Sequence, residues 1–255
     1  MKFKVKKLFF ESVDGVRLAG KIYIPKVKVK PLPTVCFCHG IPSPVRLKKD
    51  KGYAGLAEKF VKHGFIVLIF NFRGTGFSNG NFTFLGWVKD LKSVINFLCS
   101  REDVDKERLA VVGFSGGAIV STYVVAVDKR VKALVLGACP TYTRKTVGNL
   151  VKVIVESGKL GSLRGLSKQY TEKMLHKELL RITPTKWVGK VSPRPILIIH
   201  GEKDEVVGLE HAYKLYLKAK KPKKLEIIPE ASHRLRLNDK AVKKILGWLK
   251  QVFQV

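Results

Sequence analysis

A serine flanked by glycines, at the junction of two apolar segments, constrains this chain more than any other feature. The pattern is Gly113-Phe114-Ser115-Gly116-Gly117, which directly follows Leu109-Ala110-Val111-Val112 and directly precedes Ala118-Ile119-Val120-Ser121. Glycines two residues either side of the serine permit a turn too tight for side chains at those positions. The sequence therefore predicts a strand, a sharp turn that pushes a strained serine out of the sheet, and a helix. Such a turn is called a nucleophile elbow.

Length and composition favour one large domain. The chain has 255 residues, of which 45% are apolar, enough for one substantial core. No run of eighteen uncharged apolar residues occurs, and residues 1–7 alternate charged and apolar side chains. We expect a single domain over residues 1–255, with no membrane span, no signal peptide and a cytoplasmic location.

The charge balance is strongly basic. Lysine and arginine outnumber aspartate and glutamate 49 to 20, for a formal net charge of +29. The lysines are dispersed over segments near residues 2–7, 26–30, 48–51, 218–224 and 240–244, and no recognition motif organises them. Residue types that heat damages are scarce: the chain has six asparagines, three glutamines and two methionines. Such depletion is typical of thermophilic proteins. We expect a lysine-rich solvated surface on a heat-adapted protein without a nucleic-acid partner, the alternative being a real anionic partner.

The cysteines indicate no metal site. Cys36, Cys38, Cys99 and Cys139 lack paired metal-ligand spacing, and the first two lie within a predicted buried strand. We expect core thiols in a reducing compartment, and neither a metal nor a cofactor.

The rest of the chain predicts a mostly parallel sheet between helices. An opening hairpin is expected over residues 3–10 and 16–24, joined at Asp14-Gly15. Buried strands are expected at residues 34–38, 65–70, 109–112, 131–136, 196–199 and 224–228. Helical spacing recurs at residues 53–63, 85–100, 115–127, 209–220 and 239–253. The fold class is therefore α/β.

One interval is too long for a simple connection between strands. Residues 141–191 contain helical patches and no strong strand pattern. They predict either a small helical cap over the carboxyl edge of the sheet or two ordinary packing helices with loops. A cap would shape a substrate pocket from Tyr142, Leu150, Tyr170, Met174, Leu175 and Trp187.

A serine hydroxyl needs a histidine to take its proton and a carboxylate to orient that histidine. Acids follow one predicted strand directly, in Gly201-Glu202-Lys203-Asp204-Glu205. His233 follows the next strand in a loop ahead of the last helix. Because carboxyl ends of parallel strands share one edge of a sheet, we expect His233 and one of these acids to lie near Ser115.

These motifs together resemble the α/β-hydrolase superfamily over nearly the whole chain. Ser115 lies in the matching elbow, His200-Gly201-Glu202-Lys203-Asp204 is similar to its His-Gly-x-x-Asp acid loop, and Ser232-His233 is similar to its histidine loop. His39-Gly40-Ile41 resembles its oxyanion turn. The segment from Asn71 to Ser78 resembles an Asp-x-Arg-Gly-x-Gly-x-Ser stretch of esterases and serine aminopeptidase-like members, with Asn71 in place of the usual aspartate.

The resemblance implies an α/β-hydrolase fold and a role for each motif. Ser115 is implied as nucleophile, His233 as base and then acid, and Asp204 as the acid that orients His233, ahead of Glu202 and Glu205. The backbone N–H groups of Ile41 and Gly116 are implied as the oxyanion hole. His39 and His200 are expected to be structural, and His63, His176 and His211 to be exposed.

Three functions remain open at this point. The first is a cofactor-independent serine hydrolase that cleaves carboxylic esters through an acyl-enzyme. Its expected partner is a small-molecule acyl ester, which is its substrate. The second is a peptidase for short or N-blocked peptides, although the only acids in residues 141–191 are Glu156, Glu172 and Glu178. The third is a non-catalytic, hydrolase-like protein that binds anionic partners.

Overall fold

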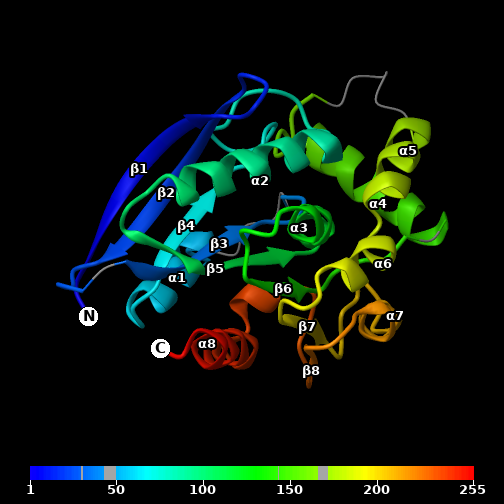
Figure 1. Ribbon diagram of the computed structural model, residues 1–255. Helices are drawn as coiled ribbons and strands as arrows, with labels where there is room; N and C mark the ends of the chain where they lie inside the picture. The colour runs from blue at the N-terminus through cyan, green and yellow to red at the C-terminus, as the bar shows by residue number, and fades with distance from the viewer. Residues whose placement is uncertain (30, 43–49, 143, 166–171) are drawn as a thin grey trace.

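The chain folds around one eight-stranded sheet. The computed structural model describes residues 1–29, 31–42, 50–142, 144–165 and 172–255 (Figure 1). The strands are β1 (Phe3–Glu11), β2 (Arg17–Pro25), β3 (Leu32–Cys38), β4 (Ile66–Phe70), β5 (Val104–Phe114), β6 (Ala133–Gly137), β7 (Ile196–Gly201) and β8 (Lys223–Ile228). Their order is β1-β2-β4-β3-β5-β6-β7-β8. β1, β2 and β4 pair antiparallel, and every pairing from β4 to β8 is parallel.

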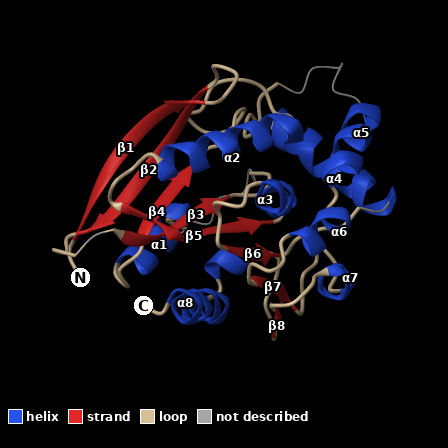
Figure 2. Cartoon of the chain, in the orientation of Figure 1, coloured by secondary structure: helices blue, strands red, loops and turns tan. Residues whose placement is uncertain are grey.

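Helices cover both faces of the sheet (Figure 2). They are α1 (Gly52–Val61), α2 (Phe84–Cys99), α3 (Gly116–Val127), α4 (Arg144–Lys159), α5 (Glu172–Ile182), α6 (Pro184–Trp187), α7 (Glu210–Lys218) and α8 (Asp239–Phe253). Apolar side chains of α1 and α8 belong to one buried cluster, and those of α2, α3, α5 and α7 to another. This arrangement confirms the predicted α/β-hydrolase fold.

Alternation along the central strands divides the core into these two layers. In β3, Cys36 and Cys38 pack with α2 and α3, whereas Val35 and Phe37 pack with α1 and α8. Side chains of successive strand residues point to opposite faces, so a strand buried on both faces needs an unbroken apolar run. This is why these strands were readable from the sequence.

The opening hairpin lies at one edge of the sheet. β1 pairs with β2 along its whole length, from Phe3 opposite Pro25 to Glu11 opposite Arg17. The turn is closed by the Gly15 N–H, which donates to the Ser12 carbonyl at 2.8 Å, and Gly15 has a φ of 78°. The hairpin predicted around Asp14-Gly15 is therefore present.

The segment between β6 and β7 is helical in its described part. α4, α5 and α6 lie together beside α3 (Figures 1 and 2). The Ser157 hydroxyl of α4 donates to the Pro42 carbonyl at 2.8 Å, and the Phe84 N–H of α2 donates to Glu178 of α5 at 2.9 Å. The Arg164 N–H donates to the Gly74 carbonyl at 2.8 Å. These bonds attach the segment to the loops that follow β3 and β4.

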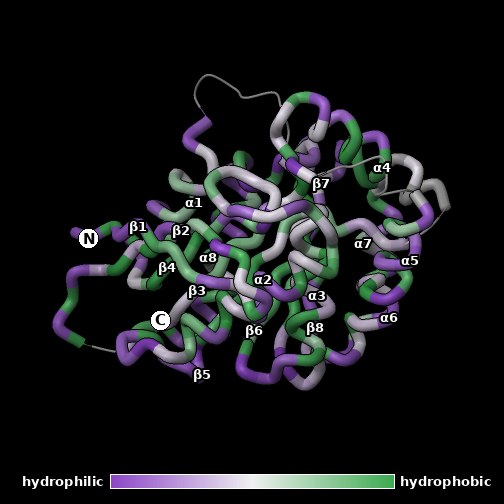
Figure 3. The backbone as a smooth tube through the Cα atoms, turned by 90° about the horizontal axis from the view of Figure 1, so that it is seen from above, coloured by the Kyte–Doolittle hydropathy of each residue, from purple (hydrophilic) through white to green (hydrophobic). Residues whose placement is uncertain are grey.

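Hydrophilic residues recur along the whole chain and form no single block (Figure 3). Much of the positive charge is exposed, as in Lys59 and Lys203, whose side chains are half exposed or more and pair with Asp239 and Glu230. Among the described residues, no helix combines the length and apolar character needed to cross a membrane. All four cysteines are free thiols, three of them buried.

Candidate active site

The elbow at Ser115 joins β5 to α3. Ser115 has φ 51° and ψ −123°, a left-handed conformation that costs energy for a residue with a side chain. Its N–H donates to the Gly137 carbonyl of β6 at 2.9 Å, and its carbonyl accepts from Ala118 at 2.9 Å. A Cβ on Gly117 would lie 2.3 Å from the His39 carbonyl oxygen, so glycine is required there. The predicted strand, strained serine and helix are all present.

The loop after β3 meets the elbow at the predicted oxyanion residues. A Cβ placed on Gly40 would lie 2.9 Å from the Ser115 Cβ and 3.4 Å from its Oγ. A Cβ placed on Gly116 would lie 3.5 Å from the Ile41 nitrogen. The structure thus brings the backbone of Ile41 and of Gly116 together beside the serine.

His39 holds this loop in place as a neutral ring. Its Nε2 accepts the Phe72 N–H at 3.1 Å, so the ring proton resides on Nδ1. Nδ1 then donates to the Gly40 carbonyl, 2.7 Å away, and fixes the peptide that carries the Ile41 N–H. Burial lowers the pKa of His39 to about 4, so this tautomer persists at neutral pH.

Asp204 follows β7 and its side chain is fully buried. Oδ1 accepts the N–H groups of Val206 at 2.9 Å and Val207 at 2.8 Å. Burial alone would raise the pKa of Asp204, but hydrogen bonds from His200, His233 and the Val207 N–H together hold it below its ordinary value. The carboxylate is therefore charged at neutral pH.

His233 lies in the loop after β8, against Asp204. Its Nδ1 is 2.8 Å from Oδ2 and 3.0 Å from Oδ1 of the carboxylate. The two loops meet closely, and the lack of a side chain on Gly201 permits this. A Cβ at that position would lie only 2.2 Å from the Ala231 carbonyl oxygen. With Nδ1 donating to Asp204, Nε2 is left to accept a proton.

The other two acids of this loop bind backbone. Glu202 accepts the Glu230 N–H at 3.1 Å, and Glu205 accepts the His233 N–H at 3.4 Å. Asp204 is thus the acid that the structure pairs with the His233 ring.

The site has two halves at one edge of the sheet. Ser115 lies at the carboxyl end of β5, and Asp204 and His233 follow the carboxyl ends of β7 and β8. Within the described residues, no hydrogen bond links Ser115 Oγ to the His233 ring. Such bonds are often long in ligand-free hydrolases and tighten when substrate binds.

The prediction for His211 was wrong, and His200 makes a contact that the sequence did not predict. His211 was predicted to be exposed but is buried, with 8% of its surface exposed. It packs against Thr141, whose N–H donates to His211 Nδ1 at 3.1 Å. His200 is fully buried, and its Nε2 lies 3.3 Å from Asp204 Oδ2. The sequence feature that could have indicated this contact is the position of His200 at a strand end, four positions before Asp204.

The segment with Asn71 forms a separate buried cluster. The Arg73 side chain pairs with Asp90 at 2.7 Å and Asp14 at 2.6 Å, and donates to the Ser12 hydroxyl at 2.9 Å. Asn71 instead accepts the Phe77 N–H at 3.4 Å. The aspartate that Asn71 replaces is therefore unnecessary for pairing Arg73.

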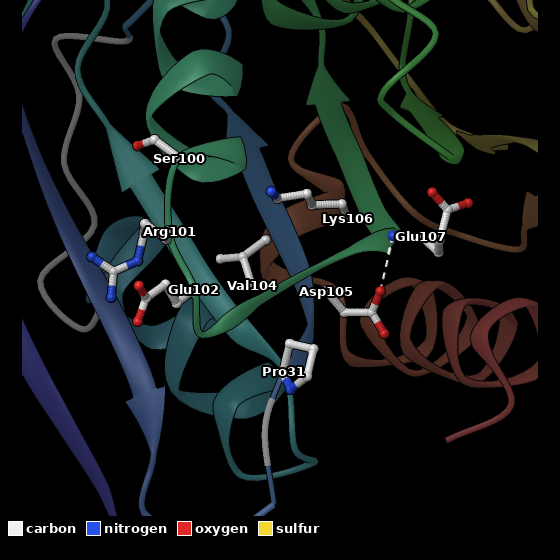
Figure 4. Close-up of a pocket in the computed structure, with 8 residues that line it drawn as sticks. All are labelled: Pro31, Ser100, Arg101, Glu102, Val104, Asp105, Lys106 and Glu107. Atoms are coloured by element: carbon white, nitrogen blue, oxygen red, sulfur yellow. Dashed lines mark hydrogen bonds between the residues drawn. The ribbon is translucent and has the colours of Figure 1, made fainter.

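A pocket of about 290 Å³ lies at the amino ends of the strands, away from the candidate active site at their carboxyl ends. It is formed where β3 and β5 begin, and its side chains are mostly charged (Figure 4). Three of these charges form ion pairs: Arg101 with Asp103 at 2.7 Å, Asp105 with Arg108 at 2.6 Å, and Glu107 with Lys132 at 2.9 Å. In the part of the chain described, no three His, Cys, Asp or Glu side chains are grouped to hold a metal ion.

Fold, elbow and family together define the class of protein. An eight-stranded sheet of this order, with a strained serine between β5 and α3, is that of a serine hydrolase of the α/β type. A model of the prolyl oligopeptidase family matches residues 56–255. The chain belongs to that family.

Individual relatives span most of the chain. The uncharacterized protein YfhR of Escherichia coli K12 is 30% identical over 230 residues, covering 88% of this chain and 72% of its own length. The uncharacterized peptidase YtmA of Bacillus subtilis is 28% identical over 205 residues, covering 77% and 76%. The structure of the Pyrococcus furiosus esterase Pf2001 has a TM-score of 0.72 at 23% identity, covering 98% of this chain and 93% of the other.

Proposed function

We propose that this hydrolase cleaves carboxylic esters through an acyl-enzyme, with Ser115, His233 and Asp204 as its catalytic residues. One observation carries the proposal: His233 Nδ1 lies 2.8 Å and 3.0 Å from the oxygens of a buried carboxylate. This pair follows two strands whose carboxyl ends lie at the same edge as the strained Ser115.

The proposed chemistry uses the same groups in both half-reactions, with His233 acting first as base and then as acid in each. His233 Nε2 takes the Ser115 proton as Oγ attacks the acyl carbonyl, and then gives it to the leaving alkoxide. Water then attacks the acyl-enzyme carbonyl while the same ring takes its proton. As the bond to Ser115 Oγ breaks and the acid leaves, the ring returns that proton to Oγ. Asp204 fixes the His233 tautomer and stabilises the imidazolium. The Ile41 and Gly116 N–H groups stabilise the oxyanion, each contributing about 3 kcal/mol in the transition state.

We also propose that residues 141–191 form a cap over this edge. Support comes from the bonds that join α4 to the Pro42 carbonyl and residue 164 to Gly74. Of the predicted pocket residues, Leu175 is buried, and Tyr142, Leu150 and Trp187 are partly buried against the core. Met174 is 46% exposed, and Tyr170 lies outside the described residues.

The acids of this segment favour an uncharged ester over a peptide with a free amino terminus. Glu178 already accepts the Phe84 N–H at the start of α2, and Glu156 is exposed. The Glu172 side chain lies outside the described residues. A peptide ammonium group therefore finds little negative charge in the described part of the cap. The esterase Pf2001, which has the same fold, also supports this choice.

A peptidase is the second candidate, because family membership favours it. The matching family is named for oligopeptidases, and YtmA is described as an uncharacterized peptidase. Amides and esters pass through the same tetrahedral intermediate, so the proposed residues serve either reaction.

The test is a comparison of kcat/KM for acyl nitrophenyl esters of rising chain length and for aminoacyl and N-blocked anilides. We expect the esters to be hydrolysed more efficiently, and Ser115→Ala to abolish that activity. Higher kcat/KM for the anilides would reverse the assignment in favour of the peptidase.

A further inference from the structure

We propose that His200 is a positioning residue: a second imidazole that donates to the Asp204 carboxylate and holds it in the orientation that His233 requires. The inference rests on the proposed function, because it assigns a task at the same carboxylate. His200 is the next-to-last residue of β7, and three residues separate it from Asp204 in sequence.

The contacts of His200 determine where its proton lies. Nε2 is 2.8 Å from the Val207 carbonyl oxygen and 3.3 Å from Asp204 Oδ2. Both neighbours are acceptors, so Nε2 must carry a hydrogen. His200 therefore shares one N–H between the two ends of the acid loop.

The other ring nitrogen argues against a packing role. Nδ1 is buried and has no hydrogen-bond partner among the described residues, while the residue as a whole has no exposed surface. An unpaired buried nitrogen destabilises a fold, so an apolar side chain would fill this space better. What histidine provides here, and an apolar residue does not, is the Nε2–H.

That N–H completes the set of donors around Asp204. Oδ1 accepts the N–H groups of Val206 and Val207. Among the described residues, the side chains paired with Oδ2 are the two imidazoles, at 2.8 Å from His233 and 3.3 Å from His200. Without His200, Oδ2 is held only by the ring that it has to orient, and the carboxylate is free to turn about its Cβ–Cγ bond.

The same N–H tunes how strongly Asp204 attracts a proton on His233. The ionisable groups nearby include Glu205, which accepts the His233 N–H, and Arg234 beside it. They also include His211 of α7, whose pKa is lowered chiefly by burial and whose Nε2 lies 3.7 Å from Glu210. Removing the His200 donor leaves more negative charge facing His233, so the imidazolium is stabilised. The acid limb of kcat/KM against pH is then expected to move to higher pH.

The test compares two replacements of equal length. His200→Gln keeps an N–H near the position of Nε2, and His200→Met removes it. We expect H200M to lower kcat/KM about 10- to 100-fold and to move the acid limb upward, as loss of an outer-shell partner does at other sites. H200Q should restore both to within about threefold. Loss of the exposed His63, in H63M, should change neither.

A double variant shows whether His200 acts through Asp204. In an Asp204→Asn background, H200M should cause little further loss, because the partner is already gone. Melting temperatures identify any variant that fails to fold, and His200→Leu is the second donor-free variant if H200M does so.

Two results would overturn the inference. In the first, H200M keeps the wild-type kcat/KM and the acid limb of its pH profile does not move. In the second, H200Q loses as much kcat/KM as H200M although both variants have the same melting temperature. Labelling by a fluorophosphonate separates this failure from that of the proposed function. If wild-type Ser115 is labelled and H200M is labelled at the same rate, only the role of His200 fails. If wild-type Ser115 is not labelled, the proposed function fails.

Discussion

Two aspartates, Asp90 and Asp204, have side chains with no exposed surface, yet they sit among opposite kinds of partners. Asp90 pairs with a guanidinium, which carries a full positive charge. In the part of the chain that the structure describes, the partners of Asp204 are backbone N–H groups and imidazoles. The difference indicates what each buried charge is for.

The Asp90 cluster holds three elements together. Arg73, after β4, donates its backbone N–H, its Nε and its Nη2 to Asp90 of α2 at 2.7 to 2.9 Å. Its other face reaches Asp14 in the hairpin turn, at 2.6 and 2.9 Å. The guanidinium compensates the carboxylate charge within the fold, so none is left to act on a substrate.

Neutral donors leave the Asp204 charge available. They keep the carboxylate ionised and oriented, but they do not cancel it. In the proposed reaction it can therefore stabilise the positive charge that forms on His233. On this account, loss of Asp204 damages catalysis and loss of Arg73 damages stability.

The largest expected effect is that of Asp204→Asn on turnover. The amide keeps the size of the side chain but can hold His233 in the wrong tautomer, so kcat should fall about 10³- to 10⁴-fold. Ester hydrolysis measures the loss, and the melting temperature should stay near that of the wild type. A loss below tenfold would contradict the assigned role.

Next in size is the effect of Arg73→Leu on stability. Asp90 would remain buried without its countercharge, so the free energy of unfolding should fall by about 3–5 kcal/mol. Urea denaturation measures this change. The folded fraction should keep kcat near wild type, and a kcat reduced as far as that of D204N would erase the distinction between the two clusters. Lys89→Leu, which removes a half-exposed partner of Asp14, is the matched control, expected to cost under about 1 kcal/mol.

A smaller effect should appear in the pH dependence of stability. Hydrogen bonds from Arg73, against some desolvation, lower the pKa of Asp14 below its ordinary value of 3.8. A lowered pKa stabilises the fold above the unfolded-state value, and that contribution disappears as pH falls below it. The melting temperature of Asp14→Asn should therefore lie below wild type at pH 6, with the gap closing below about pH 4. A gap that is constant from pH 6 to pH 3 would show that the charge of Asp14 is not involved.

The fold was largely predictable because its central strands, such as β3, β6 and β7, are buried on both faces. All eight predicted strands and all five predicted helices are present. The exception in length is β5, which begins at Val104, five residues before the predicted start. Residues 105–108 are polar and partly exposed, so they lack the apolar run that identified the rest of the strand.

The site was predictable as a set of residues and less so as a set of contacts. Sequence order gave Ser115, an acid and His233, and the resemblance selected Asp204, which the structure pairs with that ring. Nothing in the sequence reveals that Arg73 lies between Asp90 and Asp14, since the pairings span 17 and 59 residues. The burial of His211 depends in the same way on Thr141, 70 residues away.

We propose above that Ser115 is the nucleophile and that His233 and Asp204 activate it. The most direct test is to treat the wild-type protein with a fluorophosphonate and locate the adduct by peptide mass spectrometry. We expect one phosphonyl group, on Ser115, and expect it to form much more slowly in D204N. An unlabelled protein, or an adduct on another residue, would contradict it.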